Sequence, residues 1–436
     1  MLLKLHVVFG NNNPRGLNLT PATLFILSFI LYKHKDMEFL LALTIFLSLF
    51  FTAGAVLSVG AIEVSYAQFS AVITVIIAIC SGHWFKKRNE FSFYMKWTAF
   101  FISVLLSYVF TLFDLFNNEL VYATGDDFAN GRLTKPEFSF SNIKELINLI
   151  LYFLICSLVV NAKHDKIKNK VFSWSKMLII IIFIEFITKN IFNSTIFIDV
   201  VHFFLGEAKY QIDFLFERAG YNALQGFTRE PNHLARGLFI LLVGLVLTKD
   251  KSIYFYVIMG AFLLFASGSF AGFSFVFFLC AIIVVEKFNY KIFFTIPALI
   301  ILLYIVSHNV DFHYYLDRAG NLKYDLRIIS IVKSFDVFIS SPFFGVGFGN
   351  SMSFGTVSTL LSNLGLIGSL LWYFSSAHGY ELNGKRNMIM AIIILSFLFT
   401  GGKGTVYSFS TIFIFLTLSV SFSRKHLVAE NSTRCP

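Results

Sequence analysis

Long apolar segments follow one another along nearly the whole chain, with only short polar stretches between them. In lipid, a helix of about 20 mostly apolar residues can cross the hydrocarbon layer with its backbone hydrogen bonds satisfied. Only 14% of the 436 residues are charged, whereas about a quarter are charged in a soluble protein. The sequence therefore predicts an all-α integral membrane protein in which residues 1–436 form a single polytopic membrane domain.

The apolar segments predict a helical bundle of about 12 transmembrane helices, with about 11 and about 13 as the bounds. The first apolar run is expected to be retained as a helix, because no small-residue cleavage site follows it. The predicted spans cover residues 17–32, 38–58, 65–85, 97–116, 145–161, 177–197, 234–248, 253–267, 269–286, 292–307, 360–374, 388–401 and 405–422.

Basic residues in the short loops assign a side to each helix end, because lysine and arginine stay preferentially in the cytoplasm. If the loop with Lys86, Lys87 and Arg88 is cytoplasmic, alternation of the spans places every other short basic loop on the same side. Those loops contain Lys33, Lys35, Lys163, Lys166, Lys168, Lys170, Lys176, Lys249, Lys251, Lys287, Lys291, Lys385, Arg386, Arg424 and Lys425.

Three longer segments then lie outside, at residues 117–144, 198–233 and 308–359. Arginine is enriched in and beside them, although positive charge is disfavoured on that side. These arginines are Arg132, Arg218, Arg229, Arg236, Arg318 and Arg327. The guanidinium fork binds phosphate through two hydrogen bonds and keeps its charge, so the pattern indicates an anionic ligand. Pairing with acidic residues of the same segments is the alternative.

Two of the outer segments contain motifs next to a span. Gly226–Ala235 reads GFTREPNHLA and precedes the seventh span, and Ser341–Asn350 reads SPFFGVGFGN. The second motif follows Arg327–Ser330 (RIIS) and precedes Asn363–Gly368 (NLGLIG). In order, spacing and position they resemble motifs of the bacterial O-antigen polymerase (Wzy-type) and O-antigen ligase superfamily. In that family a Gly-x-x-x-Glu-Pro-Ser/Asn motif opens a mid-chain span, and a large late periplasmic loop begins with Arg and ends in a Pro-hydrophobic-Gly-x-Gly segment.

The chain departs from the family pattern in three places. Ala223 stands where members often have Arg, three residues before the motif glycine. Ser267–Gly272 reads SGSFAG, without the Arg that many members have at this turn. Ligases usually have a His-Asn pair where this chain has Phe354 and Gly355, and that difference favours a polymerase over a ligase.

The resemblance implies a glycosyltransferase of polysaccharide biosynthesis in the bacterial inner (cytoplasmic) membrane. Its expected reaction joins undecaprenyl-diphosphate-linked oligosaccharide repeat units on the periplasmic face, into the O-antigen of lipopolysaccharide or a related surface polysaccharide. No cofactor and no metal are expected, and the outer segments contain no Asp-x-Asp or metal-spaced His/Cys cluster. The expected partners are the lipid-linked oligosaccharides and membrane lipids, with a chain-length regulator and a flippase as further candidates and no nucleic acid.

Transfer of a sugar from a diphosphate needs positive charge at the leaving group and a base at the acceptor hydroxyl. The predicted diphosphate-binding residues are Arg327, Arg229, Arg318 and Arg218. The predicted catalytic residues are Glu230, His233 and His313. The alternatives are structural: Glu230 beside Pro231 stabilises a helix start, and a lone histidine is more often hydrogen-bonded within the fold.

Glu185 and Lys189 lie four residues apart in the sixth span, so their side chains can meet on one helix face. Ionisable residues at that depth are costly and usually face the interior of a bundle. We expect a structural salt bridge, with a role in handling the lipid diphosphate as the alternative.

The late outer segment is expected to be partly helical and to lie on the membrane surface. Its apolar residues recur at roughly helical spacing, with Lys323, Arg327 and Lys333 between them. The apolar positions are Tyr314, Tyr315, Leu316, Ile328, Ile329, Ile331, Val332 and Phe335.

An O-antigen ligase and a polysaccharide flippase or secondary transporter are the rival functions. Transporters commonly contain internal repeats and discontinuous helices at matching positions of the two halves. No repeat is evident in this chain, and the long outer segments at 198–233 and 308–359 lie asymmetrically. These features favour the polymerase.

Overall fold

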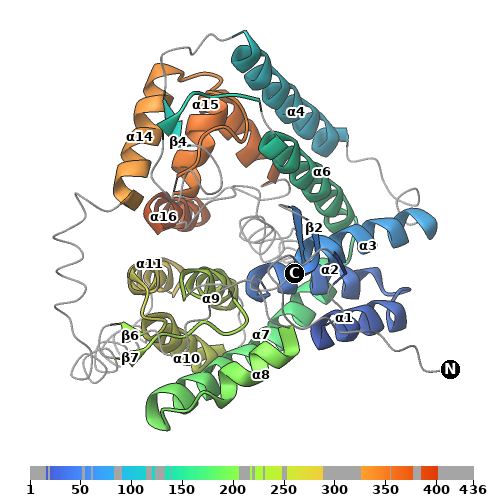
Figure 1. Ribbon diagram of the computed structural model, residues 1–436, viewed down its shortest axis with the longest axis vertical. Coiled ribbons are helices and arrows are strands. Elements are labelled where there is room, and N and C mark those ends of the chain that lie inside the picture. The colour runs from blue at the N-terminus through green and yellow to red at the C-terminus, as the bar shows by residue number, and fades with distance from the viewer. Residues whose placement is uncertain are drawn as a thin grey trace, which may run out of the picture.

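Helices make up most of the computed structural model of this chain (Figure 1). The structure describes residues 16–17, 20–51, 55–59, 62–82, 91–113, 120–122, 133–138, 140–205, 217–218, 221–228, 231–247, 253–287, 326–353, 355–376 and 384–400. Among these residues, four helices are long and apolar enough to cross a membrane, at Phe91–Leu112, Asn142–Val160, Asp165–Ile191 and Thr356–Ser376. The described helices are those of an all-α membrane protein, as predicted.

The α-helices are α1 (Pro21–Tyr32), α2 (Met37–Phe50), α3 (Tyr66–Cys80), α4 (Phe91–Leu112), α6 (Phe140–Val160), α7 (His164–Phe186), α8 (Ile196–Leu205), α9 (Pro231–Val246), α10 (Ile253–Ala266), α11 (Phe270–Lys287), α14 (Leu326–Ser340), α15 (Thr356–Ser376) and α16 (Gly384–Thr400). A short π-helix, η2 (Ile187–Ile191), continues α7. Three small antiparallel sheets pair β1 (Gly16–Leu17), β2 (Ala55–Val59) and β3 (Ile62–Ser65), then β4 (Val121–Tyr122) with β5 (Leu133–Thr134), and β6 (Glu217–Arg218) with β7 (Tyr221–Asn222).

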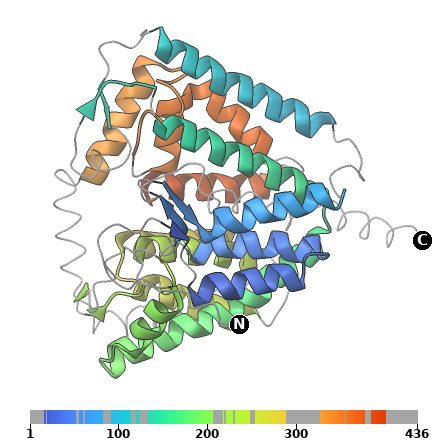
Figure 2. The ribbon, with the colours of Figure 1, turned by 45° about the vertical axis from the view of Figure 1, so that its right-hand side comes forward.

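The helices form two groups that contact each other along α3 with α6 and along α11 with α16. In Figure 1, α4, α6, α14, α15 and α16 lie together, while α1–α3 lie with α7–α11. Figure 2 shows α1, α2, α3, α6 and α4 side by side with similarly directed axes, as expected for helices that cross one apolar layer.

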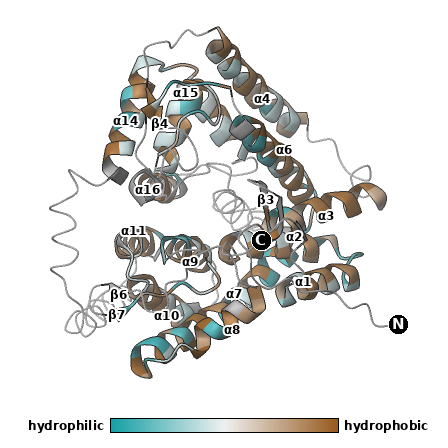
Figure 3. Cartoon of the chain, viewed as in Figure 1, coloured by the Kyte–Doolittle hydropathy of each residue, from teal (hydrophilic) through white to brown (hydrophobic). Residues whose placement is uncertain are grey.

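Apolar residues make up much of these helices (Figure 3). Ile76 of α3 and Ile102 and Leu105 of α4 are each more than half exposed. A water-soluble monomer rarely exposes large contiguous apolar patches, whereas such side chains can contact acyl chains in a bilayer. Inside the bundle, the hydroxyls of Thr44 and Ser70 lie 2.9 Å apart and link α2 to α3, as small polar residues do between membrane helices.

Eleven of the thirteen predicted spans overlap described helices, and the other two, 292–307 and 405–422, lie outside the described residues. The prediction for the second span was wrong at its end. It runs to residue 58 in the prediction, but α2 ends at Phe50 and the β2–β3 hairpin follows. The hairpin is rich in β-branched residues, which favour extended backbone over helix, and an apolar count does not distinguish the two.

The lysines predicted for the loop between the fifth and sixth spans lie mostly on a helix. α7 begins at His164, so Lys166, Lys168 and Lys170 occupy its first two turns, and Lys176 lies in its fourth turn. With η2, the continuous helix covers 27 residues, or about 40 Å at 1.5 Å per residue. That length exceeds the roughly 30 Å of a bilayer's hydrocarbon core by about 10 Å, so the first two turns, with Lys166, Lys168 and Lys170, can extend beyond the apolar layer.

The helix expected in the late outer segment is confirmed over α14, which packs against α15. Ile329 and Val332 are exposed on one side, and Ile331 and Val337 are buried on the other. The remainder of the helical pattern, at 308–325, lies outside the described residues. The position of α14 on a membrane surface stays a prediction.

Contacts between helix ends agree with the predicted alternation of sides. On the predicted outer side, the hydroxyls of Thr20 and Tyr66 lie 2.9 Å apart at the starts of α1 and α3. Gln68 of α3 donates to Asn148 Oδ1 of α6 at 2.7 Å, also toward the outer ends of these helices. On the predicted inner side, Lys170 of α7 contacts the α1–α2 turn. Ends assigned to one side therefore pack together.

Asp36 joins the inner ends of α2 and α7 and provides a test by pH. Its carboxylate accepts the Phe39 N–H at 2.9 Å and the Lys170 ammonium at 2.5 Å. Partial burial raises the pKa of Asp36, but the hydrogen bonds from Lys170 and Phe39 outweigh burial and hold the pKa below its usual 3.8. The resulting stabilisation is present above that usual value and is lost as the pH falls through the lowered pKa.

The pair is partly exposed, so we expect Asp36→Asn to lower the free energy of unfolding by less than about 1 kcal/mol at neutral pH. Below the usual pKa of 3.8, the difference between the variant and the wild type should shrink. Thermal unfolding in detergent across a pH series measures this difference. A difference that grows on acidification would contradict the assignment.

Candidate functional site

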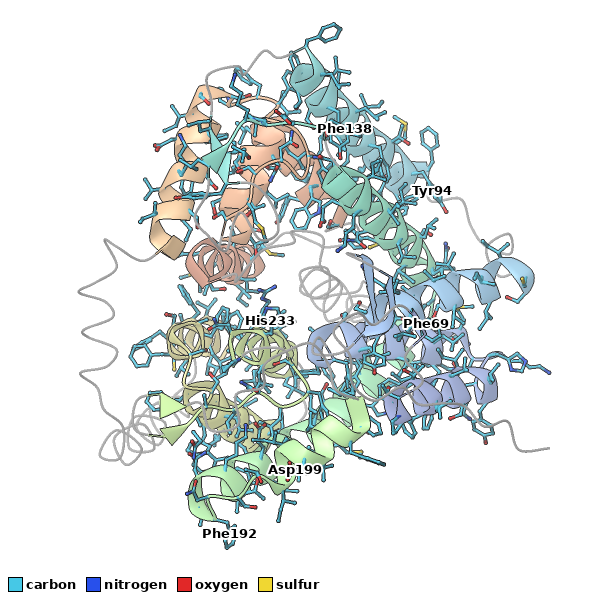
Figure 4. All side chains as sticks on the ribbon, in the orientation of Figure 1. Phe69, Tyr94, Phe138, Phe192, Asp199 and His233 are labelled. Carbon is cyan, nitrogen blue, oxygen red and sulfur yellow. The ribbon has the colours of Figure 1, made fainter. Side chains whose placement is uncertain are left out.

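Of the seven predicted site residues, His233 has a described side chain, and Arg327 and Arg218 have described backbones in α14 and β6. The other four, Glu230, His313, Arg229 and Arg318, lie outside the described residues. His233 is the third residue of α9 and is half-buried. Figure 4 shows it on the side of α9 that faces the middle of the molecule. Arg236, one turn later on the same helix, is buried.

A buried ion pair anchors the segment that leads into the first motif. Lys189 Nζ donates to Glu185 Oε1 at 2.6 Å, and the two side chains are 4% and 1% exposed. Glu185 Oε1 also accepts the backbone N–H of Gln225 at 2.9 Å, and Oε2 accepts that of Gly226 at 2.8 Å. Both carboxylate oxygens of Glu185 thus hold the chain, as expected for a structural salt bridge.

The π-helical turn η2 adds a second attachment to the same segment. The Asn222 N–H donates to Asn190 Oδ1 at 2.7 Å, and Asn190 Nδ2 donates back to the Asn222 carbonyl at 3.2 Å. Asn222 Nδ2 also donates to the Lys189 carbonyl at 3.1 Å. A π-helical turn displaces carbonyls from the regular helical ladder, which leaves one available for such a contact. The attachments fix the chain immediately before residues 229–231.

The turn at Gly226 and the start of α9 leave two buried acceptor oxygens without a hydrogen-bond partner among the described residues. Gly226 has a positive φ of 56°, and the Thr228 hydroxyl donates to the Gln225 carbonyl at 2.7 Å. α9 begins at Pro231, whose lack of an N–H suits a first helical position. Gln225 Oε1 and Asn232 Oδ1 are buried and have no hydrogen-bond partner within the described residues. These oxygens could accept hydrogen bonds from ligand hydroxyl groups.

The second motif forms a turn, residues 341–350, that packs on a break in α15; we call it the outer turn. Gly365, inside α15, has φ 63° and ψ −167°, which interrupts the helix. The N–H groups of Val346 and Gly347 donate to the carbonyls of Ser362 and Asn363 at 2.9 and 3.2 Å. In return, the N–H of Leu366 donates to the Pro342 carbonyl at 2.7 Å. The structure therefore brings together the second motif, 341–350, and the segment Asn363–Gly368 that follows it in the family-like order.

Polar side chains from α4 and α6 hold the outer turn from the other side. Thr111 Oγ1 donates to the Val346 carbonyl at 2.8 Å, and the Phe348 N–H donates to Ser107 Oγ at 3.2 Å. Asn142 Nδ2 donates to the Phe348 carbonyl and to Asn350 Oδ1, each at 2.7 Å. The sequence analysis did not identify these α4 and α6 residues. Their signal was weak: each is a polar residue at the outer end of an apolar segment.

No protein-family model matches the chain, and no curated protein matches it. The likeness to O-antigen polymerases therefore rests on the two motifs, their order and their place among the predicted spans.

Proposed function

We propose that this protein is a glycosyltransferase that polymerises undecaprenyl-diphosphate-linked oligosaccharide repeat units into O-antigen or a related surface polysaccharide. In this proposal the chain crosses the bacterial inner membrane about 12 times and acts on its periplasmic face. One observation carries the proposal. Both family-like motifs are anchored turns at helix ends that the lysine pattern assigns to the same, outer side. A flippase and a chain-length regulator are the proposed partners.

The reaction requires an acceptor hydroxyl to replace the diphosphate at the anomeric carbon of the donor sugar. In the proposed site, Arg327 and Arg229 stabilise the charge on the leaving diphosphate, with Arg318 and Arg218 as further candidates. Glu230, His233 and His313 are the candidate bases for the acceptor hydroxyl. His233 lies on the anchored helix start of α9, beside the unfilled acceptor Asn232 Oδ1, which suits a sugar-binding surface.

Replacing Arg327 tests the proposed role in binding diphosphate. Arg327→Lys keeps the charge but loses the bidentate fork, so we expect about 10²-fold less polymerisation, and Arg327→Ala should be at least as poor. The glycan chain-length profile measures the effect at equal protein level. Arg386→Lys, the same change on the predicted cytoplasmic side, should have no effect.

The rival account makes Arg327 a structural partner of Asp325 or Asp317. In that case Arg327→Lys would give nearly full-length polymer, and Asp325→Asn would reproduce the defect of Arg327→Ala. Either result would remove Arg327 from the diphosphate-binding residues.

The sidedness of the proposal can be tested with reporter fusions. A periplasm-active reporter fused after Ala162, in the turn between α6 and α7, should give no signal. The same reporter after Asp325 should give a strong signal. Asp325 belongs to the segment predicted outside, on the side opposite the lysine-rich helix ends that stay in the cytoplasm. The opposite pattern would invert the bundle and place both motifs on the cytoplasmic side.

A secondary transporter or flippase is the second candidate, and the break in α15 favours it. Discontinuous helices in transporters place backbone groups at a substrate site, and Gly365 interrupts α15 in this way. Cells that lack the gene distinguish these functions. Loss of a polymerase leaves single repeat units on the lipid at the periplasmic face, loss of a flippase leaves them at the cytoplasmic face, and loss of a ligase leaves full polymer unattached.

A further inference from the structure

Glu145 is a buried carboxyl that the two motifs and the proposed reaction do not use. It lies in α6, is 8% exposed, and its Oε2 atom has no hydrogen-bond partner within the described residues. A polar group without a partner in the protein interior is costly, and an ionised one more so. An acceptor oxygen in this state is a site for a hydrogen-bond donor from outside the chain.

The outer turn encloses Glu145 without supplying that donor. Gly349 passes so close to α6 that a Cβ built on it would lie 3.5 Å from the Cβ of Glu145. Asn142 lies about one helical turn before Glu145, but both hydrogens of its amide group are already donated to Phe348 and Asn350. Glu145 lies only about 5 Å along the helix axis from Asn142, near the predicted outer end of α6.

An exposed aromatic ring belongs to the same part of the structure. Phe138 is 48% exposed and packs edge-on against Tyr108, with ring centroids 5.3 Å apart. Tyr108 in turn packs edge-on against Phe348 of the outer turn at 6.2 Å and donates to the Asn142 carbonyl at 3.4 Å. Figure 4 shows Phe138 beside the upper ends of α4 and α6. The face of an aromatic ring carries partial negative charge and attracts polarised C–H groups.

The chemistry of these two groups selects the class of ligand. The Glu145 carboxylate would repel a diphosphate, and the neighbouring Lys144 offsets only part of that charge. In the described part of the chain, no group of three His, Cys, Asp or Glu side chains could hold a metal ion. A sugar ring satisfies both groups, because its hydroxyls donate to a carboxylate and its C–H face covers an aromatic ring.

We propose that Glu145 and Phe138 form a binding subsite for the oligosaccharide part of the lipid-linked repeat unit, at the edge of the outer turn. The Glu145 carboxylate accepts a hydrogen bond from a sugar hydroxyl, and the ring of Phe138 stacks on the sugar face. The subsite rests on the proposed function, which supplies an oligosaccharide on this side of the bundle. Its proposed role differs from that of the arginines, which bind the diphosphate in the same reaction.

The test uses two probes: lipid-linked repeat units extracted from cells that lack the gene, and the free oligosaccharide released from them by mild acid. In the purified protein, Glu145→Gln should raise the KM for lipid-linked repeat units by about tenfold or more, because the amide replaces one acceptor oxygen of the carboxyl group with an NH₂ donor. The kcat should stay within about twofold of the wild type. The free oligosaccharide should bind the wild type and bind Glu145→Gln more weakly by the same factor.

Two further variants make the result interpretable. Glu38→Gln, the same change at the start of α2 on the predicted inner side, should leave KM and oligosaccharide affinity unchanged. Phe138→Ala changes an exposed side chain, so it should fold normally and weaken oligosaccharide binding about threefold or more, as loss of a modest aromatic contact predicts.

Unchanged oligosaccharide affinity in both folded variants, Glu145→Gln and Phe138→Ala, would overturn the subsite. A lowered thermal transition in Glu145→Gln with normal affinity in Phe138→Ala would overturn it in favour of a structural role. Binding of the free oligosaccharide needs no turnover. A wild-type protein that binds it through Glu145 yet makes no polymer would therefore support the subsite and contradict the proposed polymerase.

Discussion

Gly345→Ala is expected to prevent the outer turn from packing on α15 and to be among the most destabilising single changes in this chain. Gly345 has φ +67°, and a Cβ at this position would lie 2.3 Å from the Asn363 carbonyl carbon, a backbone atom that cannot move aside alone. Backbone strain and overpacking together predict a loss of about 3 kcal/mol or more in the free energy of unfolding. The thermal transition of the purified protein measures it.

Gly82 provides a matched control for this prediction. It has nearly the same backbone conformation, with φ +63°, but no atom lies within 4 Å of a Cβ built there. Gly82→Ala should therefore show the backbone strain alone, about 1–2 kcal/mol. If Gly345→Ala and Gly82→Ala lowered the thermal transition equally, close packing of the outer turn on α15 would not be the cause.

Glu185→Gln is expected to have the second large effect, because it leaves the Lys189 ammonium buried without its counter-charge. Removal of one partner from a buried ion pair costs about 3–5 kcal/mol. The pair is 1% and 4% exposed, and the carboxylate also accepts two backbone N–H groups. Unfolding in detergent should show a lowered transition, and the protein should accumulate poorly in the membrane.

The double variant Glu185→Gln/Lys189→Met removes the stranded charge and should recover part of that loss, with a coupling of about 0.5–3 kcal/mol. Asp36→Asn is the exposed comparison and should cost much less, because its ion pair with Lys170 is 38% and 27% exposed. A double variant that is stable but makes no polymer would instead favour the alternative in which this pair handles the lipid diphosphate.

The amino-acid sequence by itself determined the helical class and the places of most helices. Apolar segments such as those of α4, α6 and α15 predicted their helices because contact with lipid or core depends on the local run of residues. In the structure, Gly226, Gly345, Gly347 and Gly349 have positive φ, which glycine adopts without a steric penalty. The prediction of a continuous helix was wrong after Phe50. There, β-branched residues form a hairpin that a count of apolar residues cannot distinguish from a helix.

Only the tertiary structure decided what holds the two motifs in place. The Glu185 carboxylate meets Gly226 across 41 residues of chain, and Ser107 meets Phe348 across 241. Likewise, the sequence did not indicate that Glu145 Oε2 is buried without a hydrogen-bond partner in the described residues, because this depends on how α6 packs against the outer turn. The physical reason is that a buried polar side chain is defined by its partners, and partners so far apart in sequence leave no periodic or local signal.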